Sequence, residues 1–571
     1  MIYLNQVGYL PDSGKIAILT HRADSFVLRD KLTGKIVYEG IPQLFGGTAP
    51  DAASGDIAYH ADFSDFRAEG DYMLCAGEFT SEPFAIRKAV YHRLKLDLIR
   101  SYYFQRCGCE LDNAHAGKFA HACCHTAPAV LPDQPGTPLD LSGGWHDAGD
   151  YGRYVTPAAT ALAHLLYAYE LFPDRFADFL NLPESGNGMP DFLNECRYEL
   201  TWLLKMQRAD GGVFHKVSTW HHAPFVMPEY DTAPLFAYSV STPATADFAA
   251  VAALAARIYA AYDAGFAGTL KQAALLSWDF LQDHPEFIAF QNPAGSGTGE
   301  YGDCSDRDER FWAAAELFSL TGEQRFLHAF LSLYEENFSK TALGYASTGG
   351  FGALSFFMNP VFAELSGTAA DCMEHREDMA ADPKTHALPQ RFPEHAKQML
   401  SLREHIRTDF IAAADTCLAL LTKNAYPVAM SPDDYHWGSN MTLMNNGILL
   451  ILGFLFTGKT DYREAALAQL HYLLGRNALG YSYVTGYGKR SCRFPHMRTV
   501  FADGIDEPVP GFVAGGPNLH PSDEPGRYHI PAGTPPMKCY LDHYACFSLN
   551  EVTIYWNSPA VFVTAFFDDI L

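Results

Sequence analysis

The feature that most constrains the fold is a change in the spacing of apolar residues near Val90. After Val90, apolar residues recur at steps of three and four along eleven segments, the spacing of helices that bury one face. Many of these segments are rich in Ala and Leu, and several end at Gly or Pro. Their number is close to what an all-α (α/α)6 barrel of six helical hairpins requires. The segments are 91–105, 157–171, 190–207, 244–262, 270–283, 308–320, 323–337, 409–424, 440–457, 462–477 and 551–569.

Before Val90, short β-prone segments follow one another at the spacing of a β-sandwich. They are 15–20, 25–30, 35–39, 58–63, 71–75 and 83–86, and the second and third are joined by the turn Lys31-Leu32-Thr33-Gly34. We therefore predict an N-terminal immunoglobulin-like β-sandwich over residues 1–87, followed by the helical barrel over residues 88–571. The stretch 359–402 has no clear pattern, and we interpret it as an insertion.

Charge and composition limit the expected partners and location of the protein. A net charge of −25 argues against nucleic acid and anionic membranes as partners. No apolar run reaches about 18 residues, and no signal peptide is visible. We expect a cytoplasmic protein, or a secreted one if the sequence starts at a mature terminus. Twelve Cys in 571 residues do not form a disulfide framework, and nothing in the sequence predicts an oligomeric state.

Two carboxylates, Asp147 and Asp150, lie three residues apart in the glycine- and aromatic-rich stretch 143–154. At this spacing both can face one small volume, such as a water molecule. Held close together they repel, so their pKa values diverge, which suits a base beside a partner that holds the water. The alternative is an Asx-type turn that caps the helix expected from Pro157.

A third carboxylate, Glu551, begins a strongly apolar helix within the stretch 540–558. A carboxyl group among apolar and aromatic side chains tends to stay protonated, as a general acid requires. The alternative is a glutamate that interacts with the helix dipole.

Two further stretches suit contacts with a sugar. His496 and Arg498 lie in a loop bounded by Gly and Pro, and both are good hydrogen-bond donors to hydroxyl groups. Trp437, two residues after Tyr435, is a candidate platform for stacking a pyranose ring. The alternative for Trp437 is a residue of the core.

Two groups of side chains suit metal ions. Thiolate and imidazole ligands favour tetrahedral zinc, although Cys109 and Cys123 could compete as ligands, and buried reduced cysteines are the alternative. Because His146 neighbours Asp147, such a metal would brace the loop rather than do chemistry. The candidate zinc ligands are Cys107, Cys124, His125 and His146.

Dense acidic oxygens at Asp308 and Glu309 suit calcium, or else cap the helix that follows.

Taken together, these stretches resemble glycoside hydrolase family 9, a family of inverting glycosidases. Residues 482–498 fit its histidine signature, residues 540–558 fit its aspartate/glutamate signature, and residues 143–154 resemble its catalytic-base motif. Pro510-Gly511 and Gly515-Gly516-Pro517-Asn518 also follow the family pattern. The resemblance covers nearly the whole chain, because an immunoglobulin-like domain before an α/α barrel marks one branch of the family.

The resemblance implies a role for each candidate residue. Asp150 matches the general base, Asp147 the carboxylate that helps hold the water, and Glu551 the general acid. It implies that His496 and Arg498 contact substrate, and Met497 stands where many members have a second histidine. It also implies structural zinc at the Cys/His group and calcium near the acidic pair named above.

We therefore predict a cellulase-like O-glycosyl hydrolase, an inverting β-glycosidase that acts on β-1,4-glucan or cello-oligosaccharides as an endoglucanase or cellodextrinase. Its partner is an oligo- or polysaccharide substrate. One alternative is an exo-β-glucosaminidase that acts on chitosan oligosaccharides. Another is a carbohydrate-binding protein that does not hydrolyse its ligand, although both signature carboxylates are present.

Overall fold

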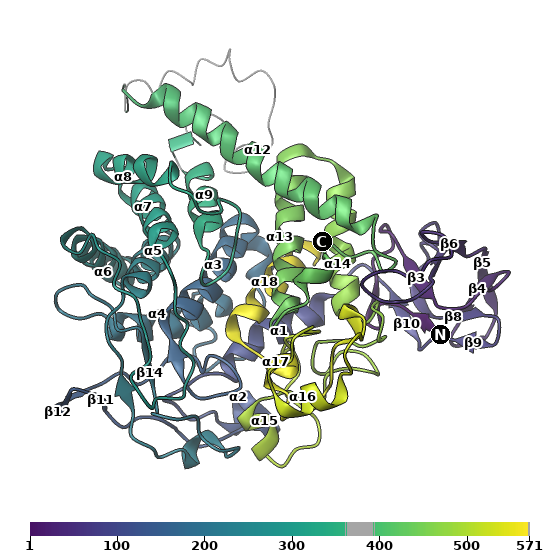
Figure 1. Cartoon of the computed structure of the whole chain (residues 1–571), viewed down its shortest axis with the longest axis horizontal. Helices are drawn as coiled ribbons and strands as arrows, with labels where there is room; N and C mark the ends of the chain where they lie inside the picture. The colour runs from purple at the N-terminus through teal and green to yellow at the C-terminus, as the bar shows by residue number, and fades with distance from the viewer. Residues whose placement is uncertain (360, 363–391, 393, 569–571) are drawn as a thin grey trace.

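The computed structural model describes residues 1–359, 361–362, 392 and 394–568. A smaller part built from strands lies to one side of a larger helical body (Figure 1). All the N-terminal strands expected from the sequence are present, and four very short ones add to them. The strands are β1 (Ile2–Tyr3), β2 (Gly8–Tyr9), β3 (Ile16–Leu19), β4 (Phe26–Asp30), β5 (Ile36–Gly40), β6 (Gln43–Leu44), β7 (Tyr59–Asp62), β8 (Gly70–Ala76), β9 (Phe79–Thr80) and β10 (Phe84–Ile86).

These strands form two sheets, in the orders β1-β3-β7-β6 and β2-β10-β8-β4-β5, with β9 paired to β8. Strands β4 and β5 are antiparallel neighbours, as the turn between them predicts. Alternate residues of β8, beginning with Tyr72, are buried and join a separate apolar core with Phe26 and Leu28. The period of two that predicted strands here therefore also places their apolar faces against each other, and the predicted N-terminal β-rich domain is confirmed.

Each of the eleven expected helices is present among the described residues. They are α1 (His92–Tyr103), α3 (Val155–Leu171), α4 (Asp191–Met206), α5 (Thr242–Tyr259), α6 (Ala264–Asp283), α7 (Arg307–Thr321), α8 (Gln324–Tyr334), α12 (Ala396–Leu421), α13 (Ser439–Thr457), α14 (Thr460–Leu473) and α18 (Ile554–Phe567).

Among the described residues, sequence patterning missed a helix of 9 residues and placed the start of α12 too late. Helix α9 (Gly349–Phe357) contains three glycines, which are poor helix formers and conceal the pattern. They allow close packing, because a Cβ atom at Gly352 would lie 2.6 Å from the ring of Phe311 on α7. Helix α12 begins inside the stretch 359–402, so the last residues of that stretch are helical although the sequence shows no clear pattern there. Most of the remainder of that stretch lies outside the described residues.

The helices contact one another in a closed circuit that runs α3, α5, α7, α9, α12, α13, α18 and back to α3. Helix α13 is long and apolar enough to cross a membrane, but it packs against α12, α14 and α18. Helix α3 follows the Asp147 and Asp150 loop, and α18 follows Glu551. Because these two helices pack together, the fold brings motifs from opposite ends of the helical domain side by side.

A small sheet beside the helices carries the loops around the two aspartates. Its strands run in the order β12-β11-β15-β14-β13. Strand β13 directly follows the aspartate loop, and β14 precedes a pair of histidines. The strands are β11 (Ala129–Leu131), β12 (Gln134–Leu139), β13 (Arg153–Tyr154), β14 (Lys216–Ser218) and β15 (Phe236–Ala237).

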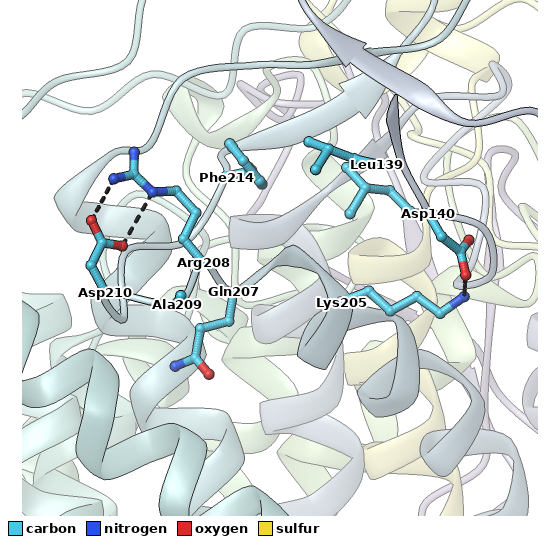
Figure 2. Close-up of a pocket in the computed structure, with 9 residues that line it drawn as sticks. Leu139, Asp140, Lys205, Gln207, Arg208, Ala209, Asp210 and Phe214 are labelled. Carbon is cyan, nitrogen blue, oxygen red and sulfur yellow. Dashed lines mark hydrogen bonds and ion pairs between the residues drawn. The ribbon is translucent and has the colours of Figure 1, made fainter. Parts of the chain in front are cut away.

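An open pocket lies where the end of β12 meets the C-terminal end of α4 (Figure 2). None of the site residues predicted from the sequence lines it. Its charged side chains pair with each other, Lys205 with Asp140 at 3.1 Å and Arg208 with Asp210. The candidate site therefore lies elsewhere.

Candidate active site

The loop that carries the two aspartates is buried and is held from behind by α4. The indole Nε1 of Trp145 donates a hydrogen bond to Oε1 of Glu195 at 2.8 Å, and its backbone N–H donates to Glu199. No side chain caps the N-terminus of α3. Oδ2 of Asp150 accepts a hydrogen bond from the backbone N–H of Gly152 at 3.1 Å, so an Asx-type turn is present, but it does not cap α3.

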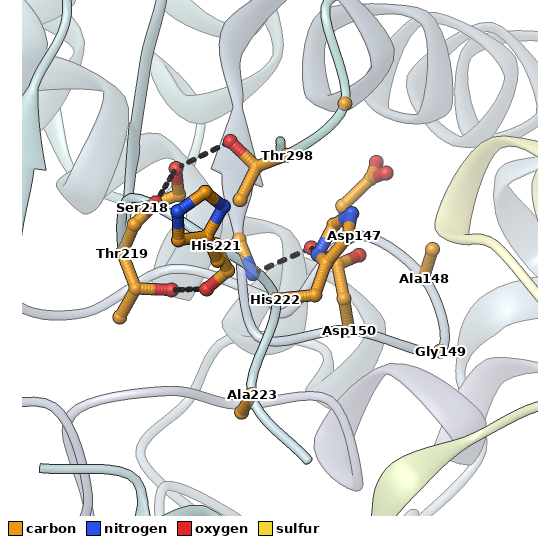
Figure 3. Close-up of polar contacts among 12 residues, drawn as sticks. Asp147, Ala148, Gly149, Asp150, Ser218, Thr219, His221, His222, Ala223 and Thr298 are labelled. Carbon is orange, nitrogen blue, oxygen red and sulfur yellow. Dashed lines mark hydrogen bonds and ion pairs between the residues drawn. The ribbon is translucent and has the colours of Figure 1, made fainter. Parts of the chain in front are cut away.

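Asp147 and Asp150 are both buried, and each accepts a hydrogen bond from a tyrosine. The Tyr301 hydroxyl donates to Oδ2 of Asp147 at 2.5 Å, and the Tyr154 hydroxyl donates to Oδ2 of Asp150 at 3.1 Å. Nδ1 of His222 lies 3.1 Å from the same Oδ2 of Asp150 (Figure 3). The side chain of Asp147 therefore contacts a neutral hydroxyl group, whereas that of Asp150 contacts both a hydroxyl group and the imidazole of His222.

These surroundings separate the two pKa values. Burial, and then the charge of Asp150, raise the pKa of Asp147 well above its usual value. Burial also acts to raise the pKa of Asp150, but the charge and hydrogen bond of His222 and the charge of Arg498 outweigh it and hold that pKa below its usual range. Asp150 is thus the carboxylate that stays ionised, and Asp147 is the one that retains a proton more strongly.

Glu551 does not begin α18, which corrects the sequence prediction. It lies between the short helix α17 (Phe547–Asn550) and α18, outside the first turn of either helix, so the helix-dipole alternative is also wrong. Glu551 pairs with His496 in an isolated parallel β-bridge. Just after it, the backbone N–H of Ile554 donates to the carbonyl oxygen of Asp147 at 2.8 Å. The three motif segments are therefore joined directly through their backbones.

The carboxyl group of Glu551 is held in its acid form. Burial, and then the negative charges of Asp150 and Asp147, raise the pKa of Glu551 well above its usual value. The charge of Arg498 opposes this shift without cancelling it. A protonated carboxyl group therefore lies near an ionised carboxylate, the combination that general acid–base chemistry needs.

Arg498 ties the loops of the site together. Its Nη1 donates to the carbonyl oxygen of Gly149 and its Nε donates to that of Ala223, both at 2.7 Å. A Cβ atom at Gly149 would lie 1.9 Å from the carbonyl oxygen of His496, so only glycine permits this approach. Arg498 is buried, and at least two of its N–H groups bind the protein.

His496 lies against the same loop as a neutral ring. Its Nδ1 lies 2.6 Å from the carbonyl oxygen of Tyr544, which can only accept, so Nδ1 carries the proton. Burial lowers the pKa of His496 to about 4. Its Nε2 is therefore an acceptor for a hydroxyl group, and the predicted role as a donor is corrected. Met497 points away, into a narrow apolar hollow that Phe104 and Leu111 also line.

The two predicted aromatic contacts are separated by the structure. Trp437 is 45% exposed, and its ring centroid lies 5.4 Å from that of Phe547, so it lies at the surface and not in the core. Tyr435 is only 1% exposed and belongs to the main core. Its predicted contact with a sugar is therefore not supported, because its side chain does not reach the surface.

The predicted Cys/His ligands come together. One ligand atom from each lies within 4.8 Å of all the others, in the one such group found among the described residues. Cys109 and the exposed Cys123 are not members of this group. The group consists of Cys107, Cys124, His125 and His146, all buried.

This group has the features of a metal centre. Burial acts to raise the pKa of Cys107, but hydrogen bonding from Cys124 and the charge of Arg153 outweigh it, so the pKa lies well below its usual value. Nε2 of His125 lies 3.2 Å from Oδ2 of Asp231, the kind of outer partner that orients an imidazole ligand. A buried thiolate beside two imidazoles fits a divalent cation.

The acidic pair Asp308 and Glu309 lies in the first turn of α7, as the sequence indicates. Oδ2 of Asp308 accepts a hydrogen bond from the backbone N–H of Thr348 at 2.8 Å. Burial and the charges of Asp308 and Asp247 raise the pKa of Glu309 well above its usual value. Asp247, on α5, is fully buried, and neither of its carboxylate oxygens has a hydrogen-bond partner among the described residues. The helix-cap alternative does not explain Asp247.

Sequence reasoning missed several of these groups, namely His222, Tyr301, Asp231 and Asp247. The nearest signal for His222 is the pair His221-His222 after a strand, and for Tyr301 its place beside the acidic stretch. Neither signal is specific. Each of these side chains interacts with a group on a segment that is remote in sequence, which no local pattern reveals.

Comparison with known proteins agrees with this geometry. The model of glycosyl hydrolase family 9 matches residues 91–564, and that of the cellulase N-terminal ig-like domain matches residues 1–81. A cellodextrinase of Butyrivibrio fibrisolvens is 39% identical, and the match covers 98% of each chain.

Two solved structures are also similar. AaCel9A in complex with cellobiose-like isofagomine is 34% identical, with full coverage of both chains and a TM-score of 0.88. A zinc-binding triple mutant of the family 9 endoglucanase J30 is 34% identical, with a TM-score of 0.86 and coverage of 98% of this chain and 99% of that one. The chain therefore belongs to glycosyl hydrolase family 9 and carries a cellulase-type ig-like domain before its helical domain.

Proposed function

We propose that this glycosyl hydrolase cleaves β-1,4-linked glucans, with soluble cello-oligosaccharides as its main substrates, and inverts the anomeric centre. One observation carries the proposal: Asp150 is held ionised while Glu551 is held protonated on adjacent segments. Its relatives include a cellodextrinase and family 9 endoglucanases. A cellobiose-like inhibitor binds one of the similar structures.

The chemistry follows from those two protonation states. Glu551 donates its proton to the glycosidic oxygen as the bond from that oxygen to C1 breaks. Asp150 removes a proton from a water molecule that attacks C1 from the opposite face. Asp147, bound by the Tyr301 hydroxyl, offers a second oxygen to orient that water. His496, through Nε2, and the exposed ring of Trp437 are the proposed contacts to the sugar.

A substrate panel tests this function against its alternatives. We expect rapid cleavage of cellohexaose, slower loss of viscosity in carboxymethyl cellulose, and no cleavage of glucosamine oligomers. Rapid cleavage of glucosamine oligomers alone would indicate a glucosaminidase. Binding of cellohexaose without any product would indicate a carbohydrate-binding protein, and either result would reject the proposal.

The helical circuit supports an architecture for this function. We propose that it is an (α/α)6 barrel over residues 88–571, behind an immunoglobulin-like domain over residues 1–87. In such a barrel the first and last hairpins meet. The contact between α3 and α18 supports this arrangement, since it brings the aspartate loop, which carries Asp147 and Asp150, beside the segment that carries Glu551.

We also propose two structural metal ions. Zinc fits the Cys/His group, and when bound it would neutralise the negative charge of buried thiolates beside the aspartate loop. Calcium fits the acidic group of Asp308, Glu309 and Asp247, because buried carboxylates that repel one another need either protons or a cation. Neither ion takes part in the proton transfers.

Removing a zinc ligand should lower stability more than it changes chemistry. Cys124→Ser should lose the bound metal and lower Tm, while kcat of the folded protein changes less. Cys123→Ser is the matched control, because Cys123 is adjacent but exposed and outside the group. Metal analysis should give about one zinc per chain. A zinc-free preparation with unchanged Tm and activity would rule out a structural zinc.

A further inference from the structure

A buried lysine lies behind the aspartate loop and takes no part in the proton transfers. Lys216 is fully buried in β14, and its backbone pairs with that of Tyr154 in β13. Its Nζ donates to Oδ1 of Asn292 at 2.6 Å, to Oγ1 of Thr298 at 2.9 Å and to the carbonyl oxygen of Gly299 at 2.6 Å. A lysine ammonium has three N–H donors, so Lys216 directs all of them at a single loop.

That loop, residues 290–301, ends at the tyrosine that binds Asp147. Tyr301 has φ +47°, a left-handed conformation that a bulky residue adopts only when its surroundings impose it. Its ring lies 4.9 Å from that of Tyr154, and its hydroxyl lies 2.5 Å from Oδ2 of Asp147. The position of that hydroxyl therefore depends on the contacts that hold the loop.

Lys216 is central among those contacts. Nδ2 of Asn292 donates to the carbonyl oxygen of Thr298 at 2.7 Å, so two of the lysine's acceptors also brace each other. The hydroxyls of Ser218, on the same strand as Lys216, and Thr298 lie 3.0 Å apart (Figure 3). The Lys216 amino group also lies 4.3 Å from the ring centroid of Tyr238. The amino group of Lys216 thus links strand β14 to two parts of the loop, Asn292 on one side and Thr298 and Gly299 on the other.

We propose that Lys216 is a positioning residue for hydrolysis: it fixes the loop 290–301 so that the Tyr301 hydroxyl stays on Asp147. The inference rests on the proposed function, because it concerns the carboxylate that orients the water beside Asp150. Lys216 acts through Tyr301, and its effect falls on the attack of water and not on protonation of the leaving group.

Lys216→Met removes the three donors and keeps a side chain of similar length. We expect kcat on cellohexaose to fall about 10- to 100-fold, because a small displacement of a positioning group has effects of this size. KM should change little. The loss should be the same on aryl glycosides with good and poor leaving groups. A loss confined to poor leaving groups, or an unchanged kcat, would overturn the proposal.

A double-mutant cycle tests whether Lys216 affects kcat through Tyr301. If Lys216 acts through Tyr301, the Lys216→Met/Tyr301→Phe protein should have the kcat of Tyr301→Phe alone. Losses that multiply would mean that the two residues act independently, which contradicts the proposal. Should Lys216→Met not fold, Thr298→Val removes one acceptor instead, and it should give a smaller loss that Tyr301→Phe likewise masks.

A matched control separates positioning from general stability. Lys15 is also fully buried and also solvates carbonyl oxygens, those of Pro11 and Ser13, but it lies in the N-terminal domain. Lys15→Met should leave kcat unchanged. Hydrogen exchange of residues 290–301 should accelerate in Lys216→Met and not in Lys15→Met. This readout needs no activity, so it tests the inference even if the wild-type protein hydrolyses no glucan, a result that would reject only the proposed function.

Discussion

Asp150→Asn is expected to lower kcat on cellohexaose by about 10²- to 10⁴-fold, the usual contribution of a general base. The amide has nearly the same shape and can still accept a hydrogen bond from the Tyr154 hydroxyl. It cannot remove a proton from water. The fold should therefore persist, and the loss should appear in kcat as measured by steady-state kinetics, with an unchanged circular dichroism spectrum.

The control for this variant is Asp210→Asn. Asp210 is also a paired aspartate, but it lies in the pocket of Figure 2, where it meets Arg208. We expect wild-type kcat for this control. An Asp150→Asn protein that retains more than about a tenth of wild-type kcat would remove Asp150 from the role of base.

Glu551→Gln is expected to show a loss that depends on the leaving group. On cellohexaose, whose leaving group needs a proton, kcat should fall by about 10²- to 10⁴-fold. On aryl glycosides whose leaving group is a stable anion, the loss should be much smaller, because no proton transfer is needed. Steady-state rates across a series of aryl glycosides test this, and equal losses across the series would contradict the assignment of Glu551 as acid.

The pH dependence gives the same variant a second readout. The pKa of Glu551 is raised above its usual value, so the acid form persists towards neutral pH, and activity should fall as pH rises through that pKa. The pKa of Asp150 is lowered, so the loss of its ionised form lies at low pH. On cellohexaose, the wild type should show an alkaline limb in kcat/KM, because its leaving group needs the proton of Glu551. With an activated aryl glycoside that limb should be weak in the wild type and absent in Glu551→Gln.

Much of the fold could be predicted from the distribution of apolar residues. Helices such as α8 bury one face, which a period near 3.6 reveals, whereas α3 and α18 are buried on nearly all sides and stand out as long apolar segments. Helix α9 could not be predicted, since Gly349, Gly350 and Gly352 carry no side chains to form the pattern. The glycines are explained only by the packing of α9 against α7, a tertiary contact. The start of α12 could not be predicted for a related reason, because no strong local pattern marks it.

The residues of the site also fall into a group that the sequence predicts and a group that it does not. Asp147, Asp150 and Glu551 stand in local motifs, so the sequence could nominate them. The groups that set their protonation could not be nominated: His222 and Tyr301 come from separate loops, and only the small sheet and the loop behind it bring them to the aspartates. Tyr435 shows the opposite failure: its position near a motif predicts a sugar contact, although its side chain belongs to the core.

The configuration of the first sugar released tests the proposed mechanism directly. Proton NMR during early turnover of a β-linked cello-oligosaccharide resolves the anomers before they equilibrate. A single displacement, with Asp150 activating water and Glu551 protonating the leaving group, predicts that the α-anomer appears first. A β-anomer as the first product would contradict the single displacement, and with it the role assigned to Asp150.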